Sequence, residues 1–100
     1  MSISKNWKAV AINGFAGYEL IVTGEANVGM LDVLPELEER IPQGINPAIW
    51  QLDLLNAGDA KPENFKPVQK NKKLIKVDQY ETVEIFSNDV SIEKIQVTTK

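Results

Sequence analysis

A proline-rich corner followed by an apolar strand is the feature that most constrains this chain of 100 residues. Pro42 and Pro47 have a fixed φ angle, and Pro47 also disfavours helical geometry at the residue before it. A helix therefore cannot continue through residues 41–47. Beyond the corner the chain alternates, and one face of the predicted strand 48–55 is entirely apolar: Ala48, Trp50, Leu52 and Leu54. We expect this face to lie in the core, with Trp50 as its buried anchor.

Other segments also alternate with the period of a β-strand. Strands are predicted at residues 7–12, 18–28, 34–41, 74–77, 82–86 and 90–97. The segment 33–41 is ambiguous, because Val33, Leu37 and Ile41 are also spaced as on one face of a helix, with Asp32 as its N-cap.

Two irregularities are predicted within the strands. Gly24 lies inside a clean alternation, which indicates a bulge or a close backbone approach. In the last strand the apolar face switches between Ile92 and Ile95, which indicates a bulge or a crossing between sheets. The polar segment 57–72 has two prolines and little period, and it therefore predicts a long loop.

About seven short strands separated by turn residues are typical of an all-β fold. We predict an immunoglobulin-like antiparallel β-sandwich of about seven strands, in a single domain that spans residues 1–100. The alternative is an α+β fold with one short helix near residues 33–41. The Cys–Trp–Cys frame of true immunoglobulin domains is absent, so the prediction concerns architecture alone.

The composition excludes several kinds of active site. The chain has no Cys and no His, which removes thiolate nucleophiles, zinc–thiolate sites, His-ligated metals and the commonest general base. The glycines do not form a dinucleotide-binding or phosphate-binding pattern. We therefore expect no catalytic residue, no cofactor and no metal site. We also expect a soluble, cytoplasmic protein, because the sequence shows neither a signal peptide nor an apolar run long enough to span a membrane.

Charge is unevenly distributed along the chain. Residues 19–40 hold six acidic side chains and one basic side chain, whereas residues 61–76 hold six lysines and one glutamate. The two segments therefore carry net charges of −5 and +5. They are expected to attract each other, either within one chain or between two copies in a self-association that salt weakens.

Six residues are candidates for an interaction surface. They lie on the predicted strands 7–12 and 48–55 and in the lysine-rich segment that precedes the predicted strand 74–77: Trp7, Gln51, Asp53, Lys70, Lys72 and Lys73. Trp7 is flanked by lysines near the start of the chain and could present an aromatic surface. Gln51 and Asp53 point away from the predicted core, and the lysines are typical of a protected edge strand. The acidic balance of the chain argues against a nucleic-acid partner.

These observations favour a non-enzymatic module for protein interaction or oligomerisation. A small-ligand or glycan-binding β-sandwich is the first alternative, and an enzyme that uses carboxylate and lysine chemistry is the second. A large exposed apolar patch would favour the interaction module, and a deep pocket with converging polar groups would favour the ligand binder. Two carboxylates that face each other across a cleft would favour the enzyme.

Overall fold

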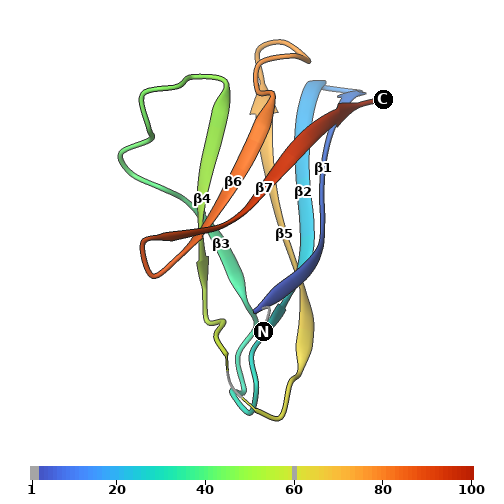
Figure 1. Cartoon of the computed structure of the whole chain (residues 1–100). Helices are drawn as coiled ribbons and strands as arrows, with labels where there is room; N and C mark the ends of the chain where they lie inside the picture. Colours follow the sequence, from blue (N-terminus) through green and yellow to red (C-terminus); the bar gives the residue numbers. More distant parts are fainter. Residues whose placement is uncertain (1–2, 60) are drawn as a thin grey trace.

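The computed structural model describes residues 3–59 and 61–100 and shows seven β-strands (Figure 1). These are β1 (Ser4–Gly14), β2 (Gly17–Asn27), β3 (Glu36–Glu39), β4 (Ile49–Leu55), β5 (Phe65–Leu74), β6 (Thr82–Ser87) and β7 (Val90–Thr99). The described residues contain no helix, and hence none that could cross a membrane. The all-β prediction is therefore confirmed. The ambiguous segment 33–41 contains the short strand β3, which contradicts the α+β alternative.

The strands form one mixed sheet in the order β3-β4-β6-β7-β1-β2-β5. The pairs β1/β7 and β4/β6 are parallel, and the other neighbours are antiparallel. The sheet curls until its two end strands, β3 and β5, lie against each other, so the fold is nearly barrel-shaped (Figure 1). The predicted immunoglobulin-like arrangement in two antiparallel sheets is not confirmed, because β7 is shared by both halves of one mixed sheet.

Strand β7 joins the two halves of the sheet by changing its partner. Its first part pairs with β6, and its last residues pair with β1. Ile85 faces Glu93 whereas Phe86 faces Ser91, so Ile92 is an extra residue that forms a bulge. The predicted irregularity between residues 92 and 95 is therefore confirmed. The bulge is the first of the two proposed causes; the change of partner begins only at Val97 and takes place within one sheet, so a crossing between sheets is not the cause.

Strand β4 carries the centre of the core, as its alternating pattern predicts. Trp50 is only 1% exposed, and Leu52 and Leu54 on the same face are also buried. Tyr80, from the loop before β6, stacks on Trp50 with the ring centroids 5.9 Å apart. The indole Nε1 of Trp50 donates a hydrogen bond to Glu39 Oε2 at 2.6 Å, so the polar group of this buried side chain has a partner. The prediction of Trp50 as the core anchor is confirmed.

The prediction of a loop over residues 57–72 and a strand at 74–77 is wrong. Strand β5 begins at Phe65 and ends at Leu74, and it pairs with β2 along this whole length. Residues 75–81 instead form the loop that leads to β6.

The polar composition of β5 explains why its pattern is hidden in the sequence. Val68 is its buried apolar residue, and Lys70 and Lys72 lie half-buried on the same face. Lysine can occupy such positions because its aliphatic stem covers apolar surface while its charge stays near water. Pro67 is tolerated because β5 is an end strand of the sheet. The strand is therefore defined by its neighbour β2 more than by its own residues.

The two oppositely charged segments lie side by side within one chain. The pairing of β2 with β5 places Glu19 opposite Lys73. Lys72 Nζ of β5 also forms an ion pair with Glu39 Oε2 of β3 at 2.8 Å. The attraction expected from the sequence is therefore satisfied at least in part inside the molecule.

Candidate interaction surfaces

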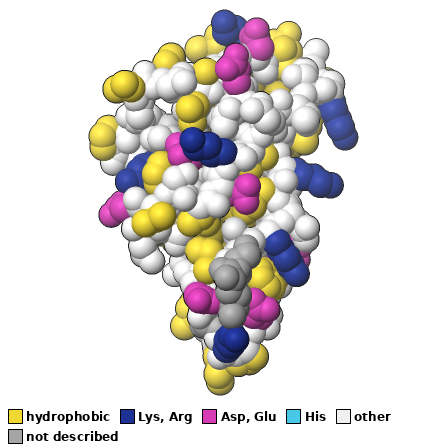
Figure 2. Space-filling view, viewed as in Figure 1, with side chains coloured by type: hydrophobic (Ala, Val, Ile, Leu, Met, Phe, Trp, Pro, Cys, Tyr) yellow, Lys and Arg dark blue, Asp and Glu magenta, His cyan; other side chains and the backbone are white. Residues whose placement is uncertain are grey.

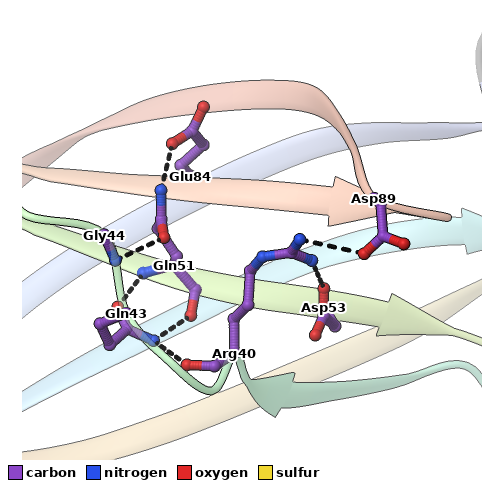
Figure 3. Close-up of polar contacts among 7 residues, drawn as sticks. All are labelled: Arg40, Gln43, Gly44, Gln51, Asp53, Glu84 and Asp89. Atoms are coloured by element: carbon purple, nitrogen blue, oxygen red, sulfur yellow. Dashed lines mark hydrogen bonds and ion pairs between the residues drawn. The ribbon is translucent and has the colours of Figure 1, made fainter.

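The outer face of β4 is covered by residues 40–44, which lead from β3 into the proline-rich corner (Figure 3). The side-chain amide of Gln43 binds the backbone of Gln51: its Oε1 accepts from Gln51 N and its Nε2 donates to Gln51 O, both at 2.8 Å. Gly44 N donates to Gln51 Oε1 at 2.8 Å, and Gln51 Nε2 donates to Glu84 Oε1 at 3.0 Å. Gln43 thus pairs with β4 as a neighbouring strand would, and Gln51 holds the corner in place.

Charged groups fasten the same segment. Arg40 Nη1 contacts Asp53 Oδ1 at 2.6 Å, and its Nη2 contacts Asp89 Oδ1 at 3.0 Å (Figure 3). The guanidinium also lies 4.3 Å from the centroid of the Phe86 ring. The hydrogen bonds to Asp53 and then Asp89 raise the pKa of Arg40. Asp53 therefore holds the start of the corner on β4.

Glu84 lies buried beneath this network on β6. Ser91 Oγ donates a hydrogen bond to Glu84 Oε2 at 2.6 Å, and Gln51 binds the other carboxylate oxygen. The hydrogen bond from Ser91 lowers the pKa of Glu84 most; burial opposes this effect and the bond from Gln51 adds to it. Glu84 is therefore an ionised carboxylate with both oxygens occupied by donors of the same chain.

The candidate lysines of β5 do not share one surface. Lys72 points toward the core, where its Nζ binds Glu39 and lies 5.4 Å from the centroid of the Trp50 ring. The hydrogen bond from Lys72 lowers the pKa of Glu39 most, and the same bond raises the pKa of Lys72. Lys70 lies on the same face as Lys72, whereas Lys73 is exposed on the opposite face. Lys72 therefore joins β5 to β3 and is not free for a partner.

Trp7 is half-buried where β1 separates from β7. Asn6 has a φ of 57° and the register of β1 with β2 shifts beside it, so β1 has a bulge that places the indole against Gly24. The indole Nε1 donates to Ser4 Oγ at 2.9 Å. Trp7 helps to line two surface hollows of about 620 and 300 Å³. The close approach predicted at Gly24 is confirmed, and Trp7 keeps access to the surface.

The six residues predicted as an interaction surface thus lie in separate places. Gln51 and Asp53 lie under the corner, the lysines lie on both faces of β5, and Trp7 lies on β1. The structure does not assemble them into one site.

A surface that the candidate residues do not include is the apolar loop, which we define as residues 30–34. Its side chains of Met30, Leu31, Val33 and Leu34 are exposed by 82%, 54%, 44% and 63%. The loop follows β2 at the lower end of the molecule, where hydrophobic side chains form the tip (Figures 1 and 2). Its sequence signal is a group of four apolar residues between Gly29 and Pro35, interrupted by Asp32 and without a steady alternation.

The buried side chain of Asn27 ties this end of the molecule together. Its Oδ1 accepts hydrogen bonds from Gly29 N at 3.0 Å and from Asn64 N at 2.9 Å. Its Nδ2 donates to Gly58 O at 2.9 Å, and its backbone oxygen accepts from Gly58 N at 3.0 Å. Asn27 therefore connects the end of β2 and the start of the apolar loop to Gly58 and Asn64, which lie between β4 and β5.

The described part of the chain holds no cluster of three or more acidic side chains that could bind a metal ion. Comparisons with models of known protein families, with curated proteins and with solved structures found no match for this chain. Its function is therefore inferred from the surfaces described above.

Proposed function

We propose that this chain is a non-enzymatic protein-interaction module that docks on a partner protein through the apolar loop. The observation that carries the proposal is the exposure of four large apolar side chains within residues 30–34. Single exposed apolar residues are ordinary on protein surfaces, whereas a contiguous group of them marks a contact site. The cost of leaving these side chains in water is removed when a partner covers them.

The backbone around the apolar loop is held in place without a partner. Besides the bonds of Asn27, Leu31 N donates to Val28 O at 3.0 Å, and Asn56 Nδ2 donates to Leu34 O at 3.2 Å. Gly29 has a φ of 58°, which glycine adopts without strain at the turn into the loop. A loop that is already ordered loses less conformational entropy on binding. Its construction therefore favours docking of a pre-formed surface.

The charges around the apolar loop indicate the chemistry of the partner. Within residues 30–34 and the described residues of 56–64, the charged side chains are three acids and one cation, and all four are exposed: Asp32, Asp59, Glu63 and Lys61. A matching partner surface has an apolar depression with a basic rim, because complementary charges at the rim orient the two molecules.

The ionisable side chains elsewhere give little support to the enzyme alternative. Glu39, Asp53 and Glu84 each bind donors of the same chain, and two of them have a lowered pKa. A general acid that works near neutral pH instead needs a raised carboxyl pKa. These carboxylates are therefore suited to structural roles.

The proposal is tested by comparing two double variants with the wild-type chain. Leu31→Ser with Leu34→Ser removes apolar surface from the loop. Phe15→Ser with Ile75→Ser removes exposed apolar side chains from the turn between β1 and β2 and from the loop after β5, and both of these segments lie at the opposite end (Figure 1). Quantitative affinity capture from a lysate of the native host should yield a protein that the wild type and the Phe15/Ile75 variant retain and the loop variant loses. Purified components should then bind with the same ranking in titration calorimetry.

Sedimentation velocity of the three purified chains shows whether the partner is a second copy. Concentration-dependent dimers that only the loop variant loses would support docking between copies. The proposal is wrong if the loop variant captures the same proteins as the wild type and sediments identically.

A further inference from the structure

A hollow of about 480 Å³ lies between the proline-rich corner and the loop 75–81. Its lining comes from residues 43, 44 and 46–49 on one side and from Lys76, Gln79 and Tyr80 on the other. Both segments lie at the end of the molecule opposite the apolar loop (Figure 1). The volume is within the range of pockets that hold small organic molecules.

The polar side chains of this hollow offer donors. Asn46 Oδ1 already accepts a hydrogen bond from Ala48 N at 3.0 Å, and Gln79 Oε1 accepts one from Ile75 N at 2.8 Å. Each amide oxygen is thus committed to the backbone, which leaves each amide NH₂ group as a donor. Within residues 3–59 and 61–100, no group accepts a hydrogen bond from either NH₂.

The charged group beside the hollow also favours a ligand that accepts hydrogen bonds. Lys76 is exposed, and no described carboxylate lies within ion-pair distance of its ammonium group. No Asp or Glu belongs to the lining. An ammonium and two NH₂ groups without a competing acid favour a ligand that carries a negative charge and accepts several hydrogen bonds.

Apolar groups form part of the remaining wall, beside Gln43 and Gly44. Pro47, Ala48 and Ile49 lie on one side and Tyr80 on the other. The Tyr80 ring is held by its stacking on the buried Trp50, at an interplanar angle of 23°. A flat apolar group can pack against a ring that is already fixed in this way.

We propose that this hollow binds an organic carboxylate whose apolar body packs against Tyr80 and Pro47 while its carboxylate faces Lys76, Asn46 and Gln79. The same chemistry is presented by a free aromatic acid and by the carboxyl end of a peptide. The hollow shares no residue with the apolar loop, so this proposal can be tested independently of the proposed protein-docking function.

The test is a titration of the isotope-labelled full chain followed by amide NMR signals, with benzoate and its neutral isostere benzamide as probes. Benzoate should shift the signals of residues 44–49 and 76–80 and saturate below about 10 mM, whereas benzamide should bind at least roughly tenfold more weakly. N-acetylphenylalanine and its amide, titrated in the same way, compare a peptide end with the free acid. Binding of both acids supports recognition of an aromatic carboxylate in general. A preference for one of them shows whether the natural ligand is a free aromatic acid or the carboxyl end of a peptide.

Three variants test the assigned contacts. Gln79→Glu and Asn46→Asp keep the oxygen that accepts from the backbone but replace the NH₂ donor with a second negative oxygen, so each should abolish benzoate binding without unfolding the chain. Lys76→Gln should weaken it by roughly tenfold, while the control Lys73→Gln on exposed β5 surface should leave it unchanged. The proposal is overturned if benzamide binds as well as benzoate, if Gln79→Glu binds normally, or if no signal saturates by about 50 mM.

Discussion

The indole of Trp7 lies against the backbone of Gly24, so close that a Cβ atom at position 24 would be 2.3 Å from Trp7 Cε3 and 2.6 Å from Cδ2. Glycine therefore provides the space that the ring occupies. The ring in turn covers a buried strand position that has no side chain of its own. The bulge at Asn6 makes this possible, because it places the indole over β2.

Gly24→Ala should destabilise the chain by about 1–3 kcal/mol, because the added methyl group overlaps the indole and one of them must move. In a Trp7→Ala background the same substitution should cost far less. The larger backbone entropy that glycine loses in a strand lowers the cost of alanine further in that background. Urea unfolding of the four chains of this double-mutant cycle measures the coupling.

Gly58→Ala is the control for this cycle, since a Cβ at position 58 would meet no atom of the described residues within 4 Å, its two chain neighbours aside. It should change stability by less than about 0.5 kcal/mol. Equal costs of Gly24→Ala in the presence and absence of the indole would show that the contact between the two residues carries no energy.

Trp50→Ala should cost about 3–5 kcal/mol, the usual range for removal of a large aromatic side chain from a core. Trp7→Ala should cost less, because Trp7 is half-buried. In a Trp7→Phe chain the emission of Trp50 should be blue-shifted and resist acrylamide. Free quenching of Trp50, together with an unchanged urea midpoint in Trp50→Ala, would contradict its placement in the core.

Asn27→Ala should destabilise the chain by more than about 2 kcal/mol, because it leaves Gly29 N, Asn64 N and Gly58 O without their partner. Hydrogen exchange of the Gly29 and Asn64 amides should accelerate more than that of amides in β4. The exposed Asn71→Ala serves as the control and should stay within about 0.5 kcal/mol of the wild type. Exchange at unchanged rates would show that Asn27 does not hold the apolar loop.

Glu84 should make stability depend on acid pH. Its pKa is lower in the folded chain than its ordinary value of 4.5, because Ser91 and Gln51 donate to the carboxylate. Its stabilising contribution is therefore fully present above about pH 4.5 and is lost as pH falls through the folded pKa. The free energies of unfolding of wild type and Glu84→Gln, measured in urea, should differ by a constant amount at pH 6–8. This difference should shrink as the pH falls below about 4.5. A difference that persists to about pH 3 would contradict the assignment.

The residues themselves determined the parts of the fold in which local pattern and tertiary environment agree. Strand β4 is recognisable because Trp50, Leu52 and Leu54 all face the core at the spacing of a strand. The bulge in β7 is recognisable because the apolar face changes between Ile92 and Ile95. In both cases the pattern of apolar side chains alone shows which face of the strand lies toward the core.

Only the tertiary structure decided the features that depend on neighbours distant in the chain. Strand β5 has polar residues at half-buried positions, so its composition does not predict a strand. Its pairing with β2 along its whole length is what makes it one. Gln51 and Asp53 do point away from the core, but the corner folds back and occupies them. The curled sheet closes β3 onto β5, so Lys72 meets Glu39.

The apolar loop and Asn27 also show which features the sequence determines and which depend on the tertiary structure. The sequence contains the run of apolar residues after Gly29, but local pattern cannot tell whether such a run will be covered by another part of the chain. Burial is a property of the whole fold, because it depends on which segments the sheet brings together. The hydrogen bonds of Asn27 tie this end of the molecule together while the four side chains of the loop stay in water, and this exposure makes the run a candidate for binding.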